Sequence, residues 1–328
     1  MLNPTTFYCE LNELCNLACE GCTFHKTERR LSFSDDLITG LISEFAAMGG
    51  STVVTCGGEA SLEGERFWNL HRSARAAGLR SFSVTNGTRI TAANARRWVT
   101  EGPSEITVSL DSHDPAKHDK WRGLPNWHVA TGAINRLLAA RDGISPRVYA
   151  MTIVAERSYR DLPDLYELVL GKLGADKLKL NMAQPTFGFV KDDKWFAENC
   201  IKDPDDLIRV IQACDHEWEI DRNPQWLADV RMYCESVLRN ADAAKGRRGA
   251  GETEWNICNS GERNIWLSWK GGARLCPSAV FPGARIRTPA DLRNFWQTAT
   301  WRDEMASCKR YCGISHSVRR EPSLRRAA

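Results

Sequence analysis

Hydrophobic and polar positions follow two periods that alternate regularly along the first half of the chain. Short runs rich in β-branched residues are typical of buried strands, and longer amphipathic segments are typical of helices. The short runs predict strands at Thr6–Leu11, Thr52–Thr55, Ser81–Thr85, Ile106–Leu110, Arg147–Val154 and Lys177–Leu180. The longer segments predict helices at Ser34–Met48, Glu65–Ala77, Ala92–Thr100, Val129–Ala140 and Leu162–Leu173.

This alternation predicts the architecture of residues 1–185. Strands that alternate with helices at this spacing form parallel βαβ units, and the functional loops then lie at the carboxyl ends of the strands. Six predicted strands are enough for an open barrel but too few for a closed eight-stranded one. We therefore predict an α/β fold, a partial (β/α)6 TIM-like barrel.

The pattern changes after residue 185. Residues 186–254 are polar and mostly helical by pattern, and we expect a linker or substrate-binding region there. Residues 265–275 predict a β-hairpin with a glycine turn at 270–272. The hairpin and the short helices after it predict a small cysteine-rich domain over residues 255–318. The last ten residues, 319–328, predict a disordered tail.

Charge and hydropathy limit where the protein is expected in the cell and which classes of partner it is expected to bind. Lys and Arg number 44 against 41 Asp and Glu, which leaves a net charge of +3. A balance so close to neutrality gives no reason to expect a nucleic acid or a membrane surface as partner. The sequence has no run of 18 apolar residues, and its N-terminus lacks the pattern of a secretory signal. We expect a cytoplasmic protein.

The twelve cysteines change the picture, because clustered cysteines in a reducing compartment more often bind metal than form disulfides. Cys15, Cys19 and Cys22 follow the first predicted strand closely. Thiolates are the usual ligands of iron–sulfur clusters, and three ligands on one loop leave one iron open for a substrate or cofactor. A zinc site completed by His25, or unrelated buried thiols, fit the same spacing. From the residues alone these alternatives stay open.

The spacing C-x3-C-x2-C after the first strand of a partial barrel resembles the radical S-adenosylmethionine (SAM) superfamily. The resemblance implies a [4Fe–4S] cluster on Cys15, Cys19 and Cys22, whose open iron binds SAM. It implies that SAM is cleaved reductively to a 5′-deoxyadenosyl radical, which takes a hydrogen atom from a substrate. It also implies an external one-electron donor such as a flavodoxin or ferredoxin. Gly21 departs from the family, which often has an aromatic residue before the third cysteine.

Further motifs carry the resemblance over residues 5–185. The Gly57–Gly58–Glu59 segment resembles the GGE segment that receives the SAM ammonium group. Two strand ends and an Arg-Gly pair resemble segments that line the SAM pocket. Each alone is equally a turn or a solvated strand end, whereas their combination is highly specific. The resemblance implies cofactor contacts for Gly57, Gly58, Glu59, Ser83, Thr85, Asn86, Ser109, Asp111 and Arg122.

A second group of cysteines consists of Cys258, Cys276, Cys308 and Cys312. Together with Gly271, five residues before Cys276, it resembles the SPASM/Twitch appendix of some radical SAM enzymes. Four cysteines imply one auxiliary [4Fe–4S] cluster of the shorter Twitch form, and therefore two clusters in the protein. A four-cysteine zinc site and unliganded core cysteines are the alternatives that the residues alone allow.

We expect the reaction to oxidise a small hydroxylated metabolite, sugar-like or aminocyclitol-like, as in natural-product biosynthesis, with the auxiliary cluster as electron acceptor. The first alternative is a radical epimerase with a cysteine hydrogen donor, for which Cys234 is our candidate beside Cys200 and Cys214. The second is a peptide (RiPP) maturase, which is disfavoured because the first strand begins within a few residues. A non-enzymatic iron–sulfur carrier would not need the GGE segment.

Overall fold

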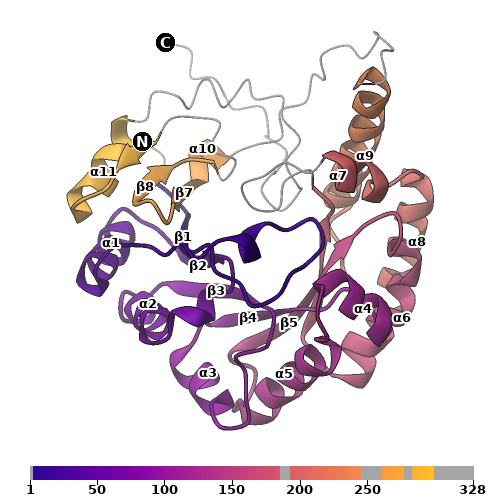
Figure 1. The fold of residues 1–328 in the computed structure, drawn as a ribbon, viewed down its shortest axis with the longest axis horizontal. Helices are drawn as coiled ribbons and strands as arrows, with labels where there is room; N and C mark the ends of the chain where they lie inside the picture. Colours follow the sequence, from indigo (N-terminus) through magenta and orange to yellow (C-terminus); the bar gives the residue numbers. More distant parts are fainter. Residues whose placement is uncertain (1–2, 185–192, 245–259, 277–282, 299–328) are drawn as a thin grey trace.

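The computed structural model describes residues 3–184, 193–244, 260–276 and 283–298 (Figure 1). The predicted barrel lies almost entirely inside these ranges. Cys276 of the predicted auxiliary site is described, whereas Cys258, Cys308 and Cys312 lie outside the described residues, as does the predicted tail. In the described part of the chain, no helix has the length and hydropathy needed to cross a bilayer.

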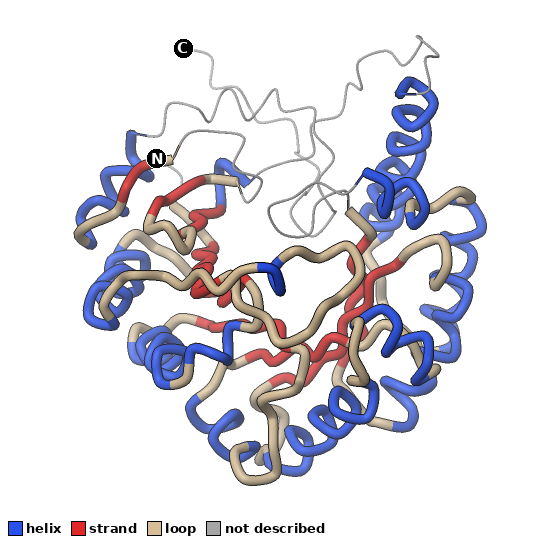
Figure 2. Tube along the Cα trace, in the orientation of Figure 1, coloured by secondary structure: helices blue, strands red, loops and turns tan. Residues whose placement is uncertain are grey.

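One sheet organises the described residues, with its strands in the order β6-β5-β4-β3-β2-β1-β7-β8-β9. The six predicted strands run parallel, and β7 pairs parallel with β1, while β8 and β9 continue the sheet antiparallel. The sheet curves without closing (Figure 2). The strands are β1 (Thr6–Asn12), β2 (Thr52–Gly57), β3 (Arg80–Thr85), β4 (Glu105–Ser109), β5 (Arg147–Val154), β6 (Lys177–Met182), β7 (Asn264–Leu267), β8 (Gly272–Arg274) and β9 (Ala284–Arg285).

Helices cover the convex side of the sheet, as Figure 1 shows for α1, α2, α3, α5 and α6. A π-helical segment, Glu167–Lys172, continues α6. The helices are α1 (Asp35–Ala47), α2 (Glu65–Ala76), α3 (Ala95–Glu101), α4 (Pro115–Arg122), α5 (Trp127–Ala140), α6 (Leu162–Tyr166), α7 (Asp193–Asn199), α8 (Pro204–Glu217), α9 (Pro224–Ala244), α10 (Ser260–Arg263) and α11 (Pro289–Thr298).

The first helix shows why these segments fold as they do. Ser34 caps α1, because its hydroxyl accepts a hydrogen bond from the backbone N–H of Leu37 at 3.2 Å. Apolar residues recur at helical spacing and are buried, and among them Phe45 packs on Phe7 of β1 with ring centroids 5.6 Å apart. The amphipathic period therefore becomes a helix because one face has a sheet to cover.

The two faces of the sheet differ in character. On the convex face, Phe7, Cys9 and Leu11 of β1 belong to the main hydrophobic core. On the opposite face, Lys179 pairs with Glu105, and its ammonium group lies 4.3 Å from the centroid of the Phe82 ring. Charged side chains on the inner face mean that this face is not built as a second dry core.

The structure confirms the predicted partial barrel, with each predicted strand found within one or two residues. It adds α4, which the hydrophobic pattern does not reveal because its buried positions are only His118 and Trp121. It also confirms the hairpin, since β7 and β8 pair antiparallel through the turn at Gly271. The pairing of β7 with β1 extends the barrel sheet, which the sequence pattern does not show.

Candidate functional site

Cys15, Cys19 and Cys22 lie on the loop that follows β1, and all three are partly exposed. The loop is compact, because the backbone N–H of Cys22 donates to the carbonyl oxygen of Cys19 at 3.2 Å. Within the described ranges, no three His, Cys, Asp or Glu side chains converge closely enough to hold a single metal ion. In an iron–sulfur cubane each cysteine binds a different iron, so its ligands stand farther apart.

Burial shapes the acidity of these thiols. It raises the pKa of Cys15 to about 11, with further upward contributions from the charges of Glu59, Cys19 and Cys22. Burial also raises the pKa of Cys22. Without a bound cation, both side chains are therefore neutral thiols at pH 7. Because metals bind the thiolate form, loading this loop must release protons.

The glycine pair at the end of β2 contacts the cysteine loop through backbone hydrogen bonds. The backbone N–H of Gly58 donates to the carbonyl oxygen of Asn12 at 3.0 Å, and that of Glu59 donates to the carbonyl oxygen of Leu14 at 2.7 Å. A Cβ atom at Gly57 would lie 2.1 Å from the first of these oxygens, and one at Gly58 2.0 Å from the second. The missing side chains therefore let two strand ends meet, and the cofactor contact predicted for Gly57 and Gly58 stays a prediction.

Glu59 is buried at the ends of β2 and β3. Its Oε1 accepts hydrogen bonds from the hydroxyl groups of Ser61 and Thr85, and its Oε2 accepts one from the backbone N–H of Asn86 at 2.8 Å. Burial raises the pKa of this carboxyl, and these hydrogen bonds oppose the rise. A carboxylate can accept about four hydrogen bonds, so Oε2 retains capacity for another donor.

Two further polar side chains reach the cysteine sulfur atoms. The Asn86 side-chain amide lies 3.9 Å from Cys15 Sγ, and the Arg122 guanidinium lies 3.8 Å from Cys19 Sγ. Arg122 also pairs with Asp111 at 2.5 Å, and the side chains of both are almost fully buried. The charges of Asp111 and Cys19 outweigh burial, which by itself lowers the pKa of Arg122, so that this pKa is raised. These contacts join the ends of β3 and β4 to the cysteine loop.

Helix α4 packs its C-terminal end on the same loop. Gly123 adopts φ of +71°, and a Cβ there would lie 2.2 Å from the carbonyl oxygen of Ala18. The backbone N–H of Glu20 donates to the carbonyl oxygen of Trp121 at 2.9 Å. The close approach and the left-handed backbone both require glycine at position 123.

An aromatic ring covers Gly21, although the sequence places none beside the third cysteine. The ring belongs to Trp195 of α7, and a Cβ at Gly21 would lie 2.6 Å from it. Trp195 in turn makes an edge-to-face contact with Trp121, with ring centroids 6.0 Å apart. The departure from the family pattern at Gly21 is thus accompanied by an aromatic side chain from a distant part of the chain.

Together these groups fit a cluster and an amino-acid-like ligand. The loop offers three thiols, Glu59 offers an anionic acceptor with spare capacity, and Arg122 offers a buried Nε–H group that has no hydrogen-bond partner among the described residues. A carboxylate acceptor and a guanidinium donor on either side of the thiols match an ammonium and a carboxylate group on one molecule. This donor set suits the expected [4Fe–4S] cluster and SAM.

The structure does not place every residue predicted to contact a cofactor or a cluster beside the cysteine loop and Glu59. Ser83 lies in register with Ile106 on the helix-covered face, where its hydroxyl accepts from that of Thr55 at 2.8 Å. Ser109 ends β4 in register with Met151, on the inner face. Cys276 is buried just after β8. The cofactor contact predicted for Ser83 and Ser109 and the cluster-ligand role predicted for Cys276 stay predictions.

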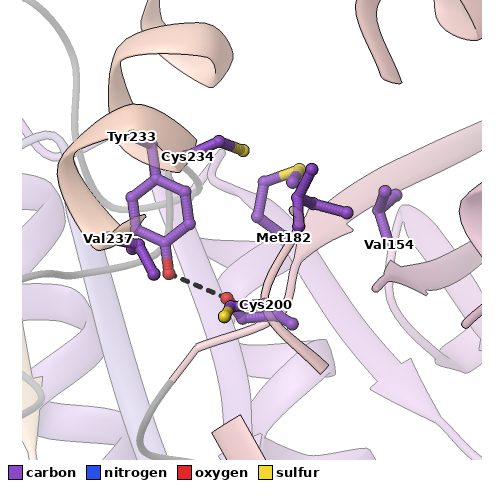
Figure 3. Close-up of a pocket in the computed structure, with 8 residues that line it drawn as sticks. Val154, Met182, Cys200, Tyr233, Cys234 and Val237 are labelled. Atoms are coloured by element: carbon purple, nitrogen blue, oxygen red, sulfur yellow. Dashed lines mark hydrogen bonds between the residues drawn. The ribbon is translucent and has the colours of Figure 1, made fainter. Parts of the chain in front are cut away.

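Cys234, the candidate hydrogen donor, lies on α9 in a small apolar pocket (Figure 3). The pocket also contains Val154 and Met182, which belong to the core on the helix-covered side of the sheet. Tyr233 closes it, and its hydroxyl donates to the carbonyl oxygen of Ala183 at 2.7 Å. Burial raises the pKa of the Cys234 thiol to about 12. Its role as a donor stays a prediction.

Sequence reasoning missed His118 and Asn126, which are fully buried beside the site. His118 stands four residues before Arg122, so the two share one face of α4. Asn126 occupies the position before α5, where an asparagine is ordinarily a helix cap. The spacing of His118 was a signal that could have been used, whereas Asn126 looked like a routine cap.

Comparisons with known proteins agree with this geometry. The model of the radical SAM superfamily matches residues 10–169. An AdoMet-dependent heme synthase of Nitratidesulfovibrio vulgaris is 34% identical over 118 residues, 35% of this chain and 32% of that protein. A GTP 3',8-cyclase of Aeromonas hydrophila is 30% identical over 149 residues, 43% of this chain and 40% of that protein. The chain thus spans less than half the length of these two curated relatives.

Solved structures share the fold over most of the chain. The crystal structure of Streptococcus suis SuiB has a TM-score of 0.69 at 14% identity and covers 93% of this chain and 68% of that one. The structure of anSMEcpe with bound AdoMet and a peptide has a TM-score of 0.63 at 16% identity and covers 94% and 84%. Residues 10–169, which hold the three cysteines on the loop after β1 and the buried GGE glutamate, match the radical SAM superfamily, and the open parallel barrel is the fold shared with these solved structures.

Proposed function

We propose that this protein is a radical SAM enzyme. When bound, the cluster and SAM supply an electron and a 5′-deoxyadenosyl radical that removes a hydrogen atom from the substrate. The observation that carries the proposal is the convergence of a buried carboxylate, a buried guanidinium and three thiols at the ends of neighbouring strands. A structural ion pair alone would not require the three thiols.

The residues of the chain have separable tasks in this proposal. Cys15, Cys19 and Cys22 would hold three irons of the cluster and leave the fourth open to SAM. Glu59 would hold the ammonium group of SAM with its carboxylate. Arg122 would offer its guanidinium charge to the carboxylate group of SAM, while Asp111 keeps the guanidinium in place. Burial of these charges strengthens each contact, because little water competes for the hydrogen bonds.

For the substrate we infer a small hydroxylated metabolite that is oxidised, with Cys258, Cys276, Cys308 and Cys312 holding an auxiliary cluster as electron acceptor. The polar inner face of the barrel supports a polar substrate. Glu10 of β1 is buried there and pairs with Arg274 of β8 at 3.4 Å. The register aligns Arg274 with Trp266, and the Trp266 ring stacks on Tyr8 at a centroid distance of 3.9 Å.

A peptide is the second candidate substrate. Two of the solved structures that share the fold, SuiB and anSMEcpe, contain a bound peptide. Because their identity to this chain is 16% or less, they support the fold directly and the substrate only by analogy. An epimerase would need a thiol facing the substrate, and Cys234 lies in the pocket on the helix-covered side.

The decisive experiment measures two products. The protein is reconstituted anaerobically with iron and sulfide, reduced with dithionite and given SAM, and 5′-deoxyadenosine is quantified by liquid chromatography. We expect turnover in the wild type and none in Cys15→Ala. Wild-type protein that loads iron but forms no 5′-deoxyadenosine above the Cys15→Ala background would contradict the proposal.

Candidate substrates are then screened by mass in heavy water. Oxidation gives a product that is two hydrogens lighter. Epimerisation gives a product of unchanged mass apart from one carbon-bound deuterium. A crosslinked or oxidised peptide in a peptide panel would assign the second candidate.

A further inference from the structure

A buried chain of hydrogen bonds connects the two sides of the cysteine loop through His118 of α4. The Nδ1 atom of His118 lies 3.1 Å from the backbone N of Asp111, and its Nε2 lies 3.2 Å from the Oδ1 of Asn126. The ring is 0% exposed. His118 and Arg122 stand one helical turn apart, and both engage Asp111, the first through its backbone and the second through its carboxylate.

The direction of each hydrogen bond is fixed by its neighbour. A backbone N–H can only donate, so His118 Nδ1 must accept from Asp111. The neutral ring then carries its proton on Nε2 and donates it to Asn126 Oδ1. This contact leaves the Asn126 amide group to donate to the backbone carbonyl oxygen of Asn86 at 3.2 Å. Burial lowers the pKa of His118, which is consistent with the neutral ring.

The side chain of Asn126 takes part in this series of hydrogen bonds and does not cap helix α5. Asn126 precedes α5 at the capping position, but its side chain makes no capping hydrogen bond. Asp119 caps the helix instead, because its Oδ1 accepts from the backbone N–H groups of Asn126 and Trp127, each at 2.7 Å. The side chain of Asn126 is therefore buried without capping α5, and both of its polar atoms form hydrogen bonds to residues outside that helix.

At each end, this series of hydrogen bonds reaches a cysteine sulfur atom. At one end, Asn86 is held by Asn126 at its carbonyl and by Glu59 at its N–H, and its side-chain amide faces Cys15 Sγ. At the other end, Asp111 is held by His118 and by the backbone N–H of Ile153, which donates to its Oδ1 at 3.0 Å. The other oxygen of Asp111 directs Arg122 towards Cys19 Sγ.

We propose that His118 and Asn126 are positioning residues that hold the N–H donors of Arg122 and Asn86 on the sulfur atoms of Cys19 and Cys15 and thereby raise the reduction potential of the cluster. The inference rests on the proposed function. Hydrogen bonds to cluster sulfur stabilise the additional negative charge of the reduced state, which makes reduction easier. Neither positioning residue touches a sulfur atom, so each acts through the donor that it orients.

The test uses His118→Phe, which keeps an aromatic ring but loses both nitrogens, and Asn126→Leu, which keeps the approximate size but loses both polar atoms. His71→Phe is the matched control, because His71 is also 0% exposed and its ring nitrogens have no hydrogen-bond partner in the part of the chain that the structure describes. Each reconstituted protein is assayed for iron content and melting temperature. A redox titration then follows the electron paramagnetic resonance signal that changes when SAM is added.

We expect both positioning variants to retain the iron content of the wild type and to be harder to reduce. The equilibrium constant for reduction should fall about tenfold, which corresponds to about 59 mV for a one-electron couple. His71→Phe should keep the wild-type potential even if its melting temperature changes. A merely structural role for His118 and Asn126 would lower the melting temperature and leave the potential where it was.

An unchanged potential in variants that load iron fully would overturn the inference while leaving the proposed function intact. A wild-type protein that shows no signal responsive to SAM would instead overturn the proposed function. If His118→Phe fails to fold, Asn126→Ser provides the second test, because it removes the same connection while the histidine ring stays in place. A wild-type potential in Asn126→Ser would likewise overturn the inference.

Discussion

Replacing Glu59 by Gln should weaken SAM binding without unfolding the protein. The side chain is buried and its two oxygens face different donors. The Oε1 atom faces the hydroxyl groups of Ser61 and Thr85, which can accept as well as donate. A glutamine can therefore place its amide nitrogen at that position, where it loses only the long 3.4 Å contact from the backbone N–H of Ser61, and keep its oxygen on the backbone N–H of Asn86.

The expected magnitude follows from the charge that is lost. A hydrogen bond to a charged group contributes about 1.5–3 kcal/mol, so its loss should weaken affinity about ten- to hundredfold. Burial raises the pKa of Glu59 because the buried charge is poorly solvated. A neutral glutamine avoids this cost, so the melting temperature of Glu59→Gln should not fall below that of the wild type.

The assay is equilibrium dialysis of SAM against anaerobically reconstituted protein, with iron content measured in the same samples. Glu63→Gln is the matched control. Glu63 is also a buried carboxylate nearby, but it accepts from Asn12 at 2.9 Å and from Arg30 at 3.1 Å. We expect this control to bind SAM within about threefold of the wild type, since each variant loses one negative charge but only Glu59 faces the site.

The dependence on pH sharpens the test. Because the pKa of Glu59 is raised above 4.5, acidification towards that pKa neutralises the carboxyl. Wild-type affinity should then fall towards that of Glu59→Gln, so the difference between the two proteins should shrink at lower pH. Equal SAM affinity of the two proteins at pH 8, with equal iron content, would refute the assignment of Glu59 as the ammonium acceptor.

Three further predictions concern the clusters, the inner face and the glycine pair. Iron analysis should give about eight irons per chain in the wild type and about four after all three loop cysteines are changed to Ala, whereas a wild type with only about four irons would refute the auxiliary cluster. Burial raises the pKa of Glu10 from 4.5 to about 7 against the opposing charge of Arg274. The folded state therefore holds this proton more tightly than the unfolded state, and its contribution to stability, present below pH 4.5, is lost as pH rises through 7. Urea unfolding should show wild-type stability falling by up to about 3 kcal/mol more than that of Glu10→Gln between pH 4.5 and 8, and parallel profiles would contradict this. Gly58→Ala would place a Cβ 2.0 Å from a backbone carbonyl of the cysteine loop and should reduce iron loading and SAM binding together, whereas Gly132→Ala, whose Cβ meets only the end of a long side chain, should leave both unchanged.

The sequence by itself determined the barrel and the position of the cysteine loop. Alternating periods predict β1 to β6 because each strand is buried and each helix has one apolar face. These local patterns are physical requirements of the fold, so they survive in a single sequence. Helix α4 escaped prediction for the same reason, since it has almost no apolar face and is held at the site through His118 and Arg122.

Only the tertiary structure decided which of the predicted polar residues meet. Ser83 and Thr85 both belong to a polar strand end, yet the hydroxyl of Ser83 bonds to Thr55 and that of Thr85 bonds to Glu59. The sequence predicts a cofactor contact for the glycine pair, and only the structure shows that two backbone carbonyl groups, at the end of β1 and in the cysteine loop, also lie against it. Contacts between residues far apart in the chain depend on strand register and loop path, which leave no local pattern in sequence.

The aromatic ring that covers Gly21 is a further example of a contact that the tertiary structure decided and the local sequence did not. The sequence shows that a ring is missing beside the third cysteine, and only the fold brings Trp195 to that place from α7. The buried chain through His118 and Asn126 likewise exists because α4 and the start of α5 dock at the ends of β3 and β4. Local periodicity fixes which segments become strands and helices, whereas long-range packing selects the hydrogen-bond partners of their polar ends.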